Sequence, residues 1–427
     1  MNLFNTIKQA NRINPMNSIF TGFIVNTIAD TLSMFGLPQI LYLSIRILGW
    51  YYIFNGFGRI NKRGLKCQMK GLTQFLLYFY IVQVIIMIIR GYLIDYSFPW
   101  TSFPSMINYH FFFGMYWLAY ILPVTAFIPI KYYNFKLFLK VAYWFAFIGI
   151  IISIFNIRNV ITQATLMSTE GDGIYGYGAQ YAAVFITFAF SVFCYKYVSP
   201  KEWKIYILSL FVSVIICAIA ARRGTSAILL TMLLMSLYYY LQTIYKGKTI
   251  ISITFILLLI IMGYYLFSNS SAFDYIQSRG MEDTRTAVDQ ALLNSMSNIE
   301  KIFGKGLNGR YFYQIGQFSN GWRYGSETGF YTIVLRGGYL MAFTYILLLG
   351  IPALQGIFNS KNVLCKGGGC YIIISLLDLY PFGALSFSLN FFIIWLLLVL
   401  VQRKEVRRMN DIQIYQLFFR EYGQKTF

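Results

Sequence analysis

The chain has 427 residues, of which 58% are hydrophobic and only 12% are charged. A water-soluble fold of this size cannot bury so much apolar surface, so the composition excludes a soluble domain and predicts a membrane protein. The net charge of +20 does not by itself indicate a nucleic-acid partner. In a membrane protein the basic residues are judged by where they lie relative to the spans.

Long apolar runs recur along the chain and predict an all-α polytopic membrane protein. In hydrocarbon every backbone amide must be paired within its own segment, and these runs are too long for the strands of a closed barrel. We expect about twelve transmembrane helices. They cover residues 19–35, 38–57, 72–94, 112–130, 137–156, 178–197, 205–221, 225–245, 249–268, 329–350, 368–384 and 387–402.

The basic residues favour one orientation of these spans. With both termini in the cytoplasm, most of the 35 Lys and Arg residues fall in cytoplasmic turns, and the opposite orientation inverts this bias. Residues 1–17 are polar and show no removable signal peptide. The expected organisation is N-terminal transmembrane helices at 1–268, a large external loop at 269–327, C-terminal transmembrane helices at 328–403 and a cytoplasmic tail at 404–427.

Cysteine and histidine usage argues against several chemistries. The five cysteines fall in predicted spans or cytoplasmic turns, so we expect no disulfide framework. They lack the spacing of metal ligands, and the single histidine, His110, lies at a span edge, where an interfacial residue is expected. Because the chain has no P-loop motif, an ATP-driven pump is also disfavoured. We expect no cofactor and no bound metal.

The external loop is where function is expected, because long loops in compact folds usually carry it. Within it, residues 284–303 have apolar side chains at helical spacing and predict one amphipathic helix that ends at Gly304 and lies on the membrane or on the bundle. The rest of the loop is rich in glycine and aromatic residues. Their flat rings suit the apolar faces of sugars, and the alternative is that they seat the loop among lipid headgroups.

Arginines near the outer ends of spans are a second signal. An arginine costs about 2.5 to 3.5 kcal/mol at the centre of a membrane helix and less near its ends, so it normally has a partner or a task. Asp30 and Arg46 lie at similar depth, and an ion pair between them is one interpretation. Arg222, Arg223 and Arg336 have no obvious carboxylate in their own spans. A bound diphosphate matches their planar, bidentate donors.

Three groups of residues, in a fixed order, carry a resemblance to a known family. Residues 220–227 are similar to the Ser-Arg-Gly that begins a span in that family. Residues 278–285, the predicted helix and the Gly-x-Gly at 303–306 resemble its arginine, helix and glycine passage. Residues 326–330 and 335–340 resemble its loop exit and the glycine-containing span that follows. The family is the O-antigen polymerase and O-antigen ligase superfamily. The likeness covers residues 216–348 well, whereas the first two hundred residues match only in topology.

The resemblance implies a GT-C-like polymerase in the bacterial cytoplasmic membrane. It would join polyprenyl-diphosphate-linked oligosaccharide repeats into O-antigen or capsular polysaccharide on the outer face. The implied partners are the undecaprenyl-diphosphate-linked oligosaccharide, membrane lipids and a chain-length regulator protein, with no nucleic acid. Many relatives, ligases especially, have a histidine where this chain has Glu327, so the polymerase is favoured over the ligase.

Within this interpretation the site residues have distinct roles. Glu327 is expected to take the proton of the attacking sugar hydroxyl, and the alternative is an ion pair with Arg323 one helical turn earlier. Arg223 and Arg285 are expected to act with it by stabilising charge on the diphosphate. Other external carboxylates considered for the base are Glu170, Asp172 and Asp283. The expected substrate-binding residues are Arg222, Arg279, Arg310, Arg323, Arg336, Trp322 and Tyr324.

Three other functions remain open at this point. An O-antigen ligase, a flippase of lipid-linked oligosaccharides and a secondary transporter of small anions belong to the same membrane setting. The flippase and the transporter would also use intramembrane arginines. A transporter usually shows corresponding broken helices in two halves of the chain, and no such repeat is evident here.

Overall fold

The structure is a computed structural model. It describes residues 14–34, 38–61, 65–93, 117–170, 185–219, 223–245, 254, 257, 285–314, 321–326, 328–380 and 385–419. Over these residues the fold is almost entirely helical, with one short hairpin. Five of the described helices are long and apolar enough to cross a membrane, at Leu72–Gly91, Lys136–Arg158, Pro200–Ile219, Gly224–Ile244 and Gly329–Phe358. The chain is therefore an all-α membrane protein, and the number of spans stays a prediction.

The elements follow the order of the chain. The first part contains α2 (Pro15–Met34), α3 (Gln39–Asn61), α4 (Leu72–Leu93), η2 (Trp117–Phe127), η3 (Ile130–Tyr132), α6 (Lys136–Glu170), η4 (Ala189–Cys194), α8 (Pro200–Ile219) and α9 (Arg223–Ile244). The second part contains α12 (Arg285–Asn294), α13 (Asn298–Phe303), β1 (Tyr311–Phe312), β2 (Trp322–Arg323), α14 (Gly329–Phe358), α15 (Val363–Asp378), α16 (Leu389–Gln402), α17 (Lys404–Arg408) and α18 (Asp411–Phe418).

Helices occupy most of the predicted spans, with two differences in helix type. The spans predicted at 112–130 and 178–197 contain the 3-10 helices η2 and η4 in place of long α-helices. In η2, Pro123 lies inside the helix, where it has no backbone N–H to donate. The span predicted at 249–268 lies outside the described residues apart from two positions.

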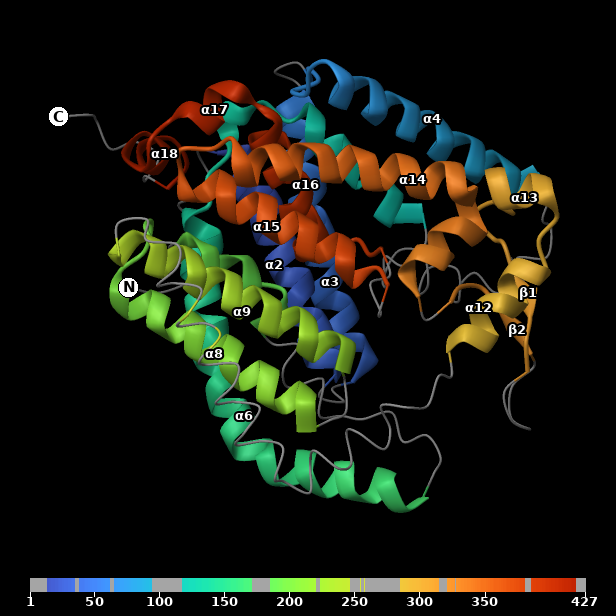
Figure 1. The fold of residues 1–427 in the computed structure, drawn as a ribbon, viewed down its shortest axis with the longest axis horizontal. Coiled ribbons are helices and arrows are strands. Elements are labelled where there is room, and N and C mark those ends of the chain that lie inside the picture. The colour runs from blue at the N-terminus through green and yellow to red at the C-terminus, as the bar shows by residue number, and fades with distance from the viewer. Residues whose placement is uncertain are drawn as a thin grey trace.

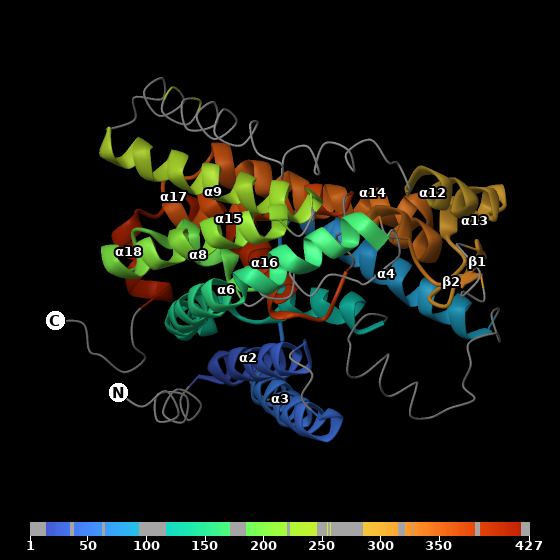
Figure 2. The same ribbon diagram turned by 90° about the horizontal axis from the view of Figure 1, so that it is seen from below.

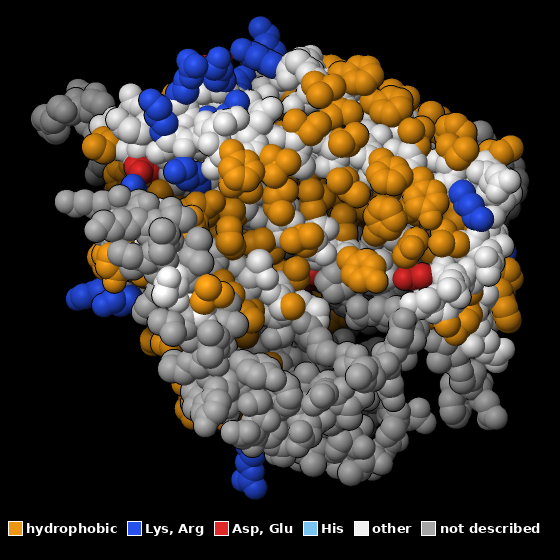
Figure 3. Space-filling view, in the orientation of Figure 1, with side chains coloured by type: hydrophobic (Ala, Val, Ile, Leu, Met, Phe, Trp, Pro, Cys, Tyr) orange, Lys and Arg blue, Asp and Glu red, His pale blue; other side chains and the backbone are white. Residues whose placement is uncertain are grey.

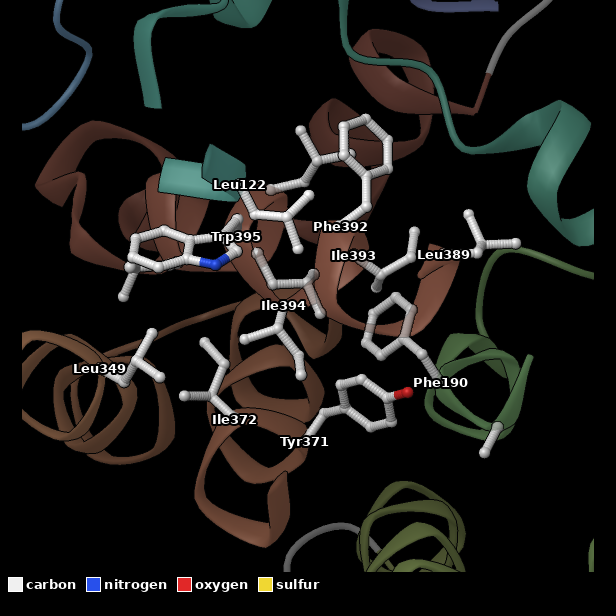
Figure 4. Close-up of a cluster of buried hydrophobic side chains, with 14 of the residues drawn as sticks. Leu122, Phe190, Leu349, Tyr371, Ile372, Leu389, Phe392, Ile393, Ile394 and Trp395 are labelled. Atoms are coloured by element: carbon white, nitrogen blue, oxygen red, sulfur yellow. The ribbon is translucent and has the colours of Figure 1, made fainter. Parts of the chain in front are cut away.

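The core is organised around α16, a short apolar helix that is buried along most of its length. It packs against α14, α15, η2 and α2. Figure 4 shows Trp395 and Ile394 of α16 with Leu349 from α14 and Ile372 from α15 beside them. A helix that is apolar on every side has to be enclosed, and here other helices enclose it.

A tightly packed hairpin of α2 and α3 lies on one side of the bundle (Figure 2). A Cβ atom built on Gly22 of α2 would lie 2.5 Å from the backbone oxygen of Gly49 in α3. Small residues at contacts between membrane helices allow backbones to approach this closely. Arg46 and Asp30 form an ion pair across this hairpin, so the pairing anticipated from their similar depth is confirmed.

Different elements lie at the two ends of the bundle (Figure 1). At one end lie α17 and α18, and we define residues 404–419 and the turns that contact them as the tail end. At the opposite end lie α12, α13 and the hairpin of β1 and β2. We define residues 285–314, 321–326 and 328–338 as the loop end. In Figure 3, Lys and Arg side chains gather at the tail end, and hydrophobic side chains cover the surface over α4 and α14.

Several turns that were predicted to be cytoplasmic meet at the tail end. The Nζ atom of Lys196 lies 2.7 Å from a carboxylate oxygen of Asp411. Arg403 donates from Nε to the backbone oxygen of Gln68 at 3.1 Å. These contacts join segments that are far apart in the sequence and agree with their placement on a common side of the membrane. The assignment of that side to the cytoplasm stays a prediction.

Candidate functional site at the loop end

The predicted loop forms two helices where the sequence predicted one. A turn at residues 295–297 separates α12 from α13, so the single amphipathic helix over 284–303 is wrong. The side chain of Ser297 accepts a hydrogen bond from the backbone N–H of Glu300, and the Glu300 carboxylate accepts one from the N–H of Ser297. This capping box begins a new helix. The predicted stop is confirmed, because Gly304 caps α13 with a φ of 74°.

The two loop helices have different surroundings. Val288 and Leu292 of α12 are buried against the protein. On α13, by contrast, Ile299 and Phe303 are exposed. The apolar residues that were predicted to form one stripe are therefore divided between two helices. One packs on the bundle, and the other has an apolar face that stays exposed within the described part of the chain.

The long helix α14 is broken where the loop meets it. Gly338 has a φ of 76° and a ψ of 175°, which lie outside the helical region. Next to this break, the carbonyl oxygen of Leu335 accepts a hydrogen bond from the N–H of Lys305 at 2.7 Å. The carbonyl oxygen of Arg336 accepts one from the N–H of Gly306 at 2.9 Å. Backbone groups at a break in a membrane helix need partners, and the loop supplies them here.

Glycine is required on both sides of this contact. A Cβ atom on Gly304 would lie 2.1 Å from the carbonyl oxygen of Arg336. A Cβ atom on Gly338 would lie 2.0 Å from the carbonyl oxygen of Ile302. Both glycines also have positive φ, which other residues rarely adopt. The loop segment at 303–306 and the glycine-containing segment of α14 at 335–340 are therefore in direct contact.

The same loop segment is attached to α4. The backbone N–H of Leu307 donates to the carbonyl of Met87 at 3.1 Å. The side-chain amide of Asn308 donates to the carbonyl of Gly91, also at 3.1 Å. A Cβ atom on Gly306 would lie 2.6 Å from the backbone nitrogen of Gly91. The loop is thus attached to both α4 and α14 mainly through backbone atoms.

Asp289 of α12 holds the segment that returns from the loop to α14. Its buried carboxylate accepts hydrogen bonds from the hydroxyl groups of Ser326 and of Thr328, the latter at 2.9 Å. Thr328 is the residue that precedes α14, so the carboxylate lies at the N-terminus of a helix, where negative charge is favoured. Ser326 and Thr328 flank Glu327 in the sequence, and Glu327 itself lies outside the described residues.

Residues 324–326 are each anchored by a different contact. Arg336 donates to the carbonyl of Tyr324 at 3.5 Å. The hydroxyl of Tyr311 donates to the carbonyl of Gly325 at 3.2 Å. The hydroxyl oxygen of Thr332 accepts a hydrogen bond from the backbone N–H of Ser326 at 2.9 Å. Contacts on three consecutive residues restrict this backbone, which is a condition for positioning a functional side chain.

The short hairpin carries aromatic and basic residues that were predicted to bind substrate. Phe312 pairs with Trp322 across the two strands, and both side chains are exposed. The Arg310 guanidinium lies 4.3 Å from the centroid of the Trp322 ring. The Arg323 guanidinium lies 5.6 Å from the centroid of Tyr313. The hairpin therefore presents cations and flat rings together, an arrangement that suits anionic and hydroxyl-rich ligands.

The predicted site residues fall into three groups. The first group lies at the loop end and consists of Arg310, Trp322, Arg323, Tyr324 and Arg336. The second group lies at the first or last residue of a helix, and the structure does not describe these side chains. It consists of Arg223 in α9, Arg285 in α12 and Glu170 in α6. The third group lies outside the described residues and consists of Arg222, Arg279, Glu327, Asp172 and Asp283.

The sequence interpretation missed Asp289. A signal was present, because Asp289 lies beside Val288 and one turn before Leu292 on a predicted amphipathic helix. A carboxylate next to the apolar stripe of such a helix predicts a buried hydrogen-bonding partner. The partners, Ser326 and Thr328, are too far away in the sequence for spacing to identify them.

The described part of the chain contains no group of three or more His, Cys, Asp or Glu residues that could hold a metal ion. The side chains gathered at the loop end are instead guanidinium, hydroxyl, aromatic and carboxylate groups. These groups favour recognition of phosphate and sugar oxygens. Comparison of the chain with models of protein families, with curated proteins and with solved structures finds no match.

Proposed function

We propose that this chain is a membrane glycosyltransferase that joins polyprenyl-diphosphate-linked oligosaccharide repeats into O-antigen or capsular polysaccharide. The observation that supports this most is the contact between Gly304–Gly306 and the break in α14 at residues 335–338. These segments belong to two of the three stretches on which the family resemblance depends. They are separated in the sequence yet adjacent in space, as parts of one site have to be.

The proposed reaction transfers a growing chain to a new repeat. The terminal hydroxyl oxygen of the acceptor attacks the anomeric carbon of the donor, and a new carbon–oxygen bond forms. The bond from that carbon to the diphosphate breaks, and the polyprenyl diphosphate leaves with the electron pair. Glu327 takes the hydroxyl proton, while Arg223 and Arg285 stabilise the charge of the leaving group.

The remaining residues are assigned to substrate binding. Arg222 and Arg279 are proposed to bind the diphosphate, and the hairpin with Trp322 and Arg310 is proposed to hold the sugars. Arg336 is buried and donates to the backbone of Tyr324, so its proposed role includes holding the loop exit in place.

The proposed setting is the bacterial cytoplasmic membrane. About twelve spans would place both termini in the cytoplasm and the loop end on the outer face. The partners in this setting are membrane lipids, the undecaprenyl-diphosphate-linked oligosaccharide and a chain-length regulator protein.

The direct test uses purified protein in lipid nanodiscs with a lipid-linked repeat as substrate. We expect chain elongation by the wild type and reduced elongation by Glu327→Gln, Arg223→Ala and Arg285→Ala, with unchanged expression. Arg408→Ala, an exposed arginine at the tail end, is the matched control. No elongation by the wild type would contradict the activity, whereas wild-type elongation by all three variants would place the site elsewhere.

A deletion strain separates the related functions. Loss of a polymerase leaves surface glycolipid that carries a single repeat. Loss of a ligase leaves lipid-linked polymer that is not attached, and loss of a flippase leaves neither product. We expect the single-repeat phenotype, restored by the wild-type chain.

A further inference from the structure

Helix α13 has an apolar face that the described residues leave exposed. Ile299, Ile302 and Phe303 follow the i, i+3, i+4 spacing that places side chains on one side of a helix. They are 68%, 49% and 45% exposed. Val288 and Leu292 of the neighbouring helix α12 are buried. A contiguous exposed apolar face of this kind marks a surface that contacts another apolar phase.

The position of α13 is fixed at one end of α4. The carbonyl of Phe303 accepts from the Arg90 guanidinium at 3.5 Å, and Leu307 donates to Met87 just beyond it. The apolar span of α4, Leu72–Gly91, has 20 residues. At about 1.5 Å per residue it is about 30 Å long, which equals the thickness of the hydrocarbon core. With α4 spanning the hydrocarbon core, α13 at its end lies at the level where hydrocarbon gives way to headgroups.

The exposed face of α13 adjoins two helices that also expose apolar side chains. Ile86 and Ile89 of α4 and Phe343 and Leu347 of α14 are exposed. Both helices are long and apolar enough to span a membrane. They pack side by side, and α13 packs on α14 (Figure 1). Exposed apolar side chains are thus present on both candidate spans and on the loop helix that contacts them.

Basic residues accompany this apolar face. Lys301 lies on α13 between Ile299 and Ile302, and Arg90 lies in the last turn of α4 and donates to the carbonyl of Phe303. Both side chains are half-buried. Cations with long aliphatic stems suit the depth of lipid phosphates, where the stem stays in the apolar layer and the charge reaches the headgroups.

We propose that α13 lies in the membrane surface, with Ile299, Ile302 and Phe303 inserted between the headgroups and acyl chains of the leaflet at the loop end. Lipid is the occupant because the face adjoins two candidate spans that also expose apolar side chains. Helix α12 attaches the same loop to the bundle, so the loop joins protein and bilayer. This inference does not depend on the proposed enzymatic activity.

The test is spin-label accessibility in lipid nanodiscs. A nitroxide is attached to a cysteine introduced by Ile299→Cys or Ile302→Cys, in a Cys67→Ser background, because the other four cysteines are buried. Power saturation then compares collisions with oxygen, which concentrates in the bilayer, and with a water-soluble nickel chelate. Gln290→Cys, at an exposed position of α12, is the aqueous control, and Ile86→Cys on α4 is the lipid control.

We expect the ratio of oxygen to nickel accessibility at Ile299 and Ile302 to resemble that at Ile86 and to exceed that at Gln290. A ratio like that of Gln290 would place α13 in water and overturn the proposal. Low accessibility to both reagents would also overturn it, since it would mean that protein covers the face. All labelled positions are exposed, so folding is expected to hold, and monodisperse size-exclusion profiles check it.

Discussion

The two ends of the bundle each use one carboxylate to hold a returning chain segment, but the partners differ. At the tail end, Asp411 accepts hydrogen bonds from the Tyr197 hydroxyl and the Val363 N–H, and it pairs with Lys196, with all three contacts at 2.7 Å. At the loop end, Asp289 accepts from the two hydroxyl groups that flank position 327. An ion pair contributes to the tail end, whereas neutral hydroxyl donors hold the loop exit.

The two ends also differ in whether side chains or backbone atoms make the packing contacts. At the tail end, Phe419 stacks on Tyr197 with ring centroids 4.4 Å apart and an interplanar angle of 10°. At the loop end, backbone meets backbone at Gly304 and Gly338. Side-chain contacts can be weakened one by one, while a backbone contact through glycine excludes any Cβ atom. The loop end is therefore expected to be the less tolerant of substitution.

The largest expected effect comes from Gly338→Ala. The new Cβ atom meets the Ile302 carbonyl, and the positive φ is strained for alanine, so we expect a loss of at least about 2 kcal/mol in unfolding free energy. Thermal unfolding in nanodiscs measures it. Gly350→Ala is the matched control on the same helix, because its Cβ atom would only approach Leu376 at 3.8 Å. Equal stability of the two variants would contradict the glycine contact.

The next effect is expected from Asp289→Ala. It releases Ser326 and Thr328, and a displacement of the neighbouring Glu327 by about 1 Å can cost on the order of 100-fold in rate. The measurement is the initial rate of chain elongation per folded protein. Asp289→Asn keeps one acceptor oxygen and is expected to retain part of the rate. An unchanged rate for Asp289→Ala would separate this carboxylate from the proposed chemistry.

A smaller effect is expected from Asp411→Asn at the tail end. The ion pair with Lys196 is partly exposed, so its loss is expected to cost about 1 kcal/mol in stability. Hydrogen exchange at the amides of Val363 and Leu364 measures the loosening. Elongation is expected to remain at the wild-type rate. A rate loss as large as that of Asp289→Ala would remove the distinction between the two ends.

The smallest effect is expected between the ends, where α4 packs on α14. Gln83 donates from Nε2 to the hydroxyl of Thr344 at 3.2 Å. Hydrogen bonds between membrane helices contribute about 0.6 kcal/mol on average. A double-mutant cycle with Gln83→Leu and Thr344→Val is expected to give a coupling of that size. A coupling energy several times larger would contradict the expectation that this hydrogen bond makes the smallest contribution to stability.

Much of the fold could be predicted from local pattern. Apolar runs located most of the observed helices, and Gly304 was recognised as a helix stop. The division of the loop helix at Ser297 was missed, although its capping box is also a local signal. The spacing of apolar residues continues across the short turn between α12 and α13, so this spacing gave no sign of the turn.

Only part of the candidate site could be predicted from the sequence. Arg310, Trp322 and Arg323 could be selected by residue type, because guanidinium and aromatic groups suit phosphate and sugar. The contacts of Arg310 with the Trp322 ring and of Arg323 with the Tyr313 ring could not be predicted, because they depend on the pairing of β1 with β2. Asp289 could not be matched to Ser326 and Thr328, since a hydrogen bond across a loop leaves no periodic trace in the sequence.

The sequence by itself determined that the chain is an all-α membrane protein, because hydrocarbon requires long apolar segments with internally paired backbones. It also determined where most of the helices lie. Only the tertiary structure decided that Gly304 lies against Arg336 and Gly338 against Ile302, and that the described residues bury the apolar face of α12 while leaving that of α13 exposed. Those outcomes depend on which surfaces approach each other in space, and composition and periodicity do not encode that proximity.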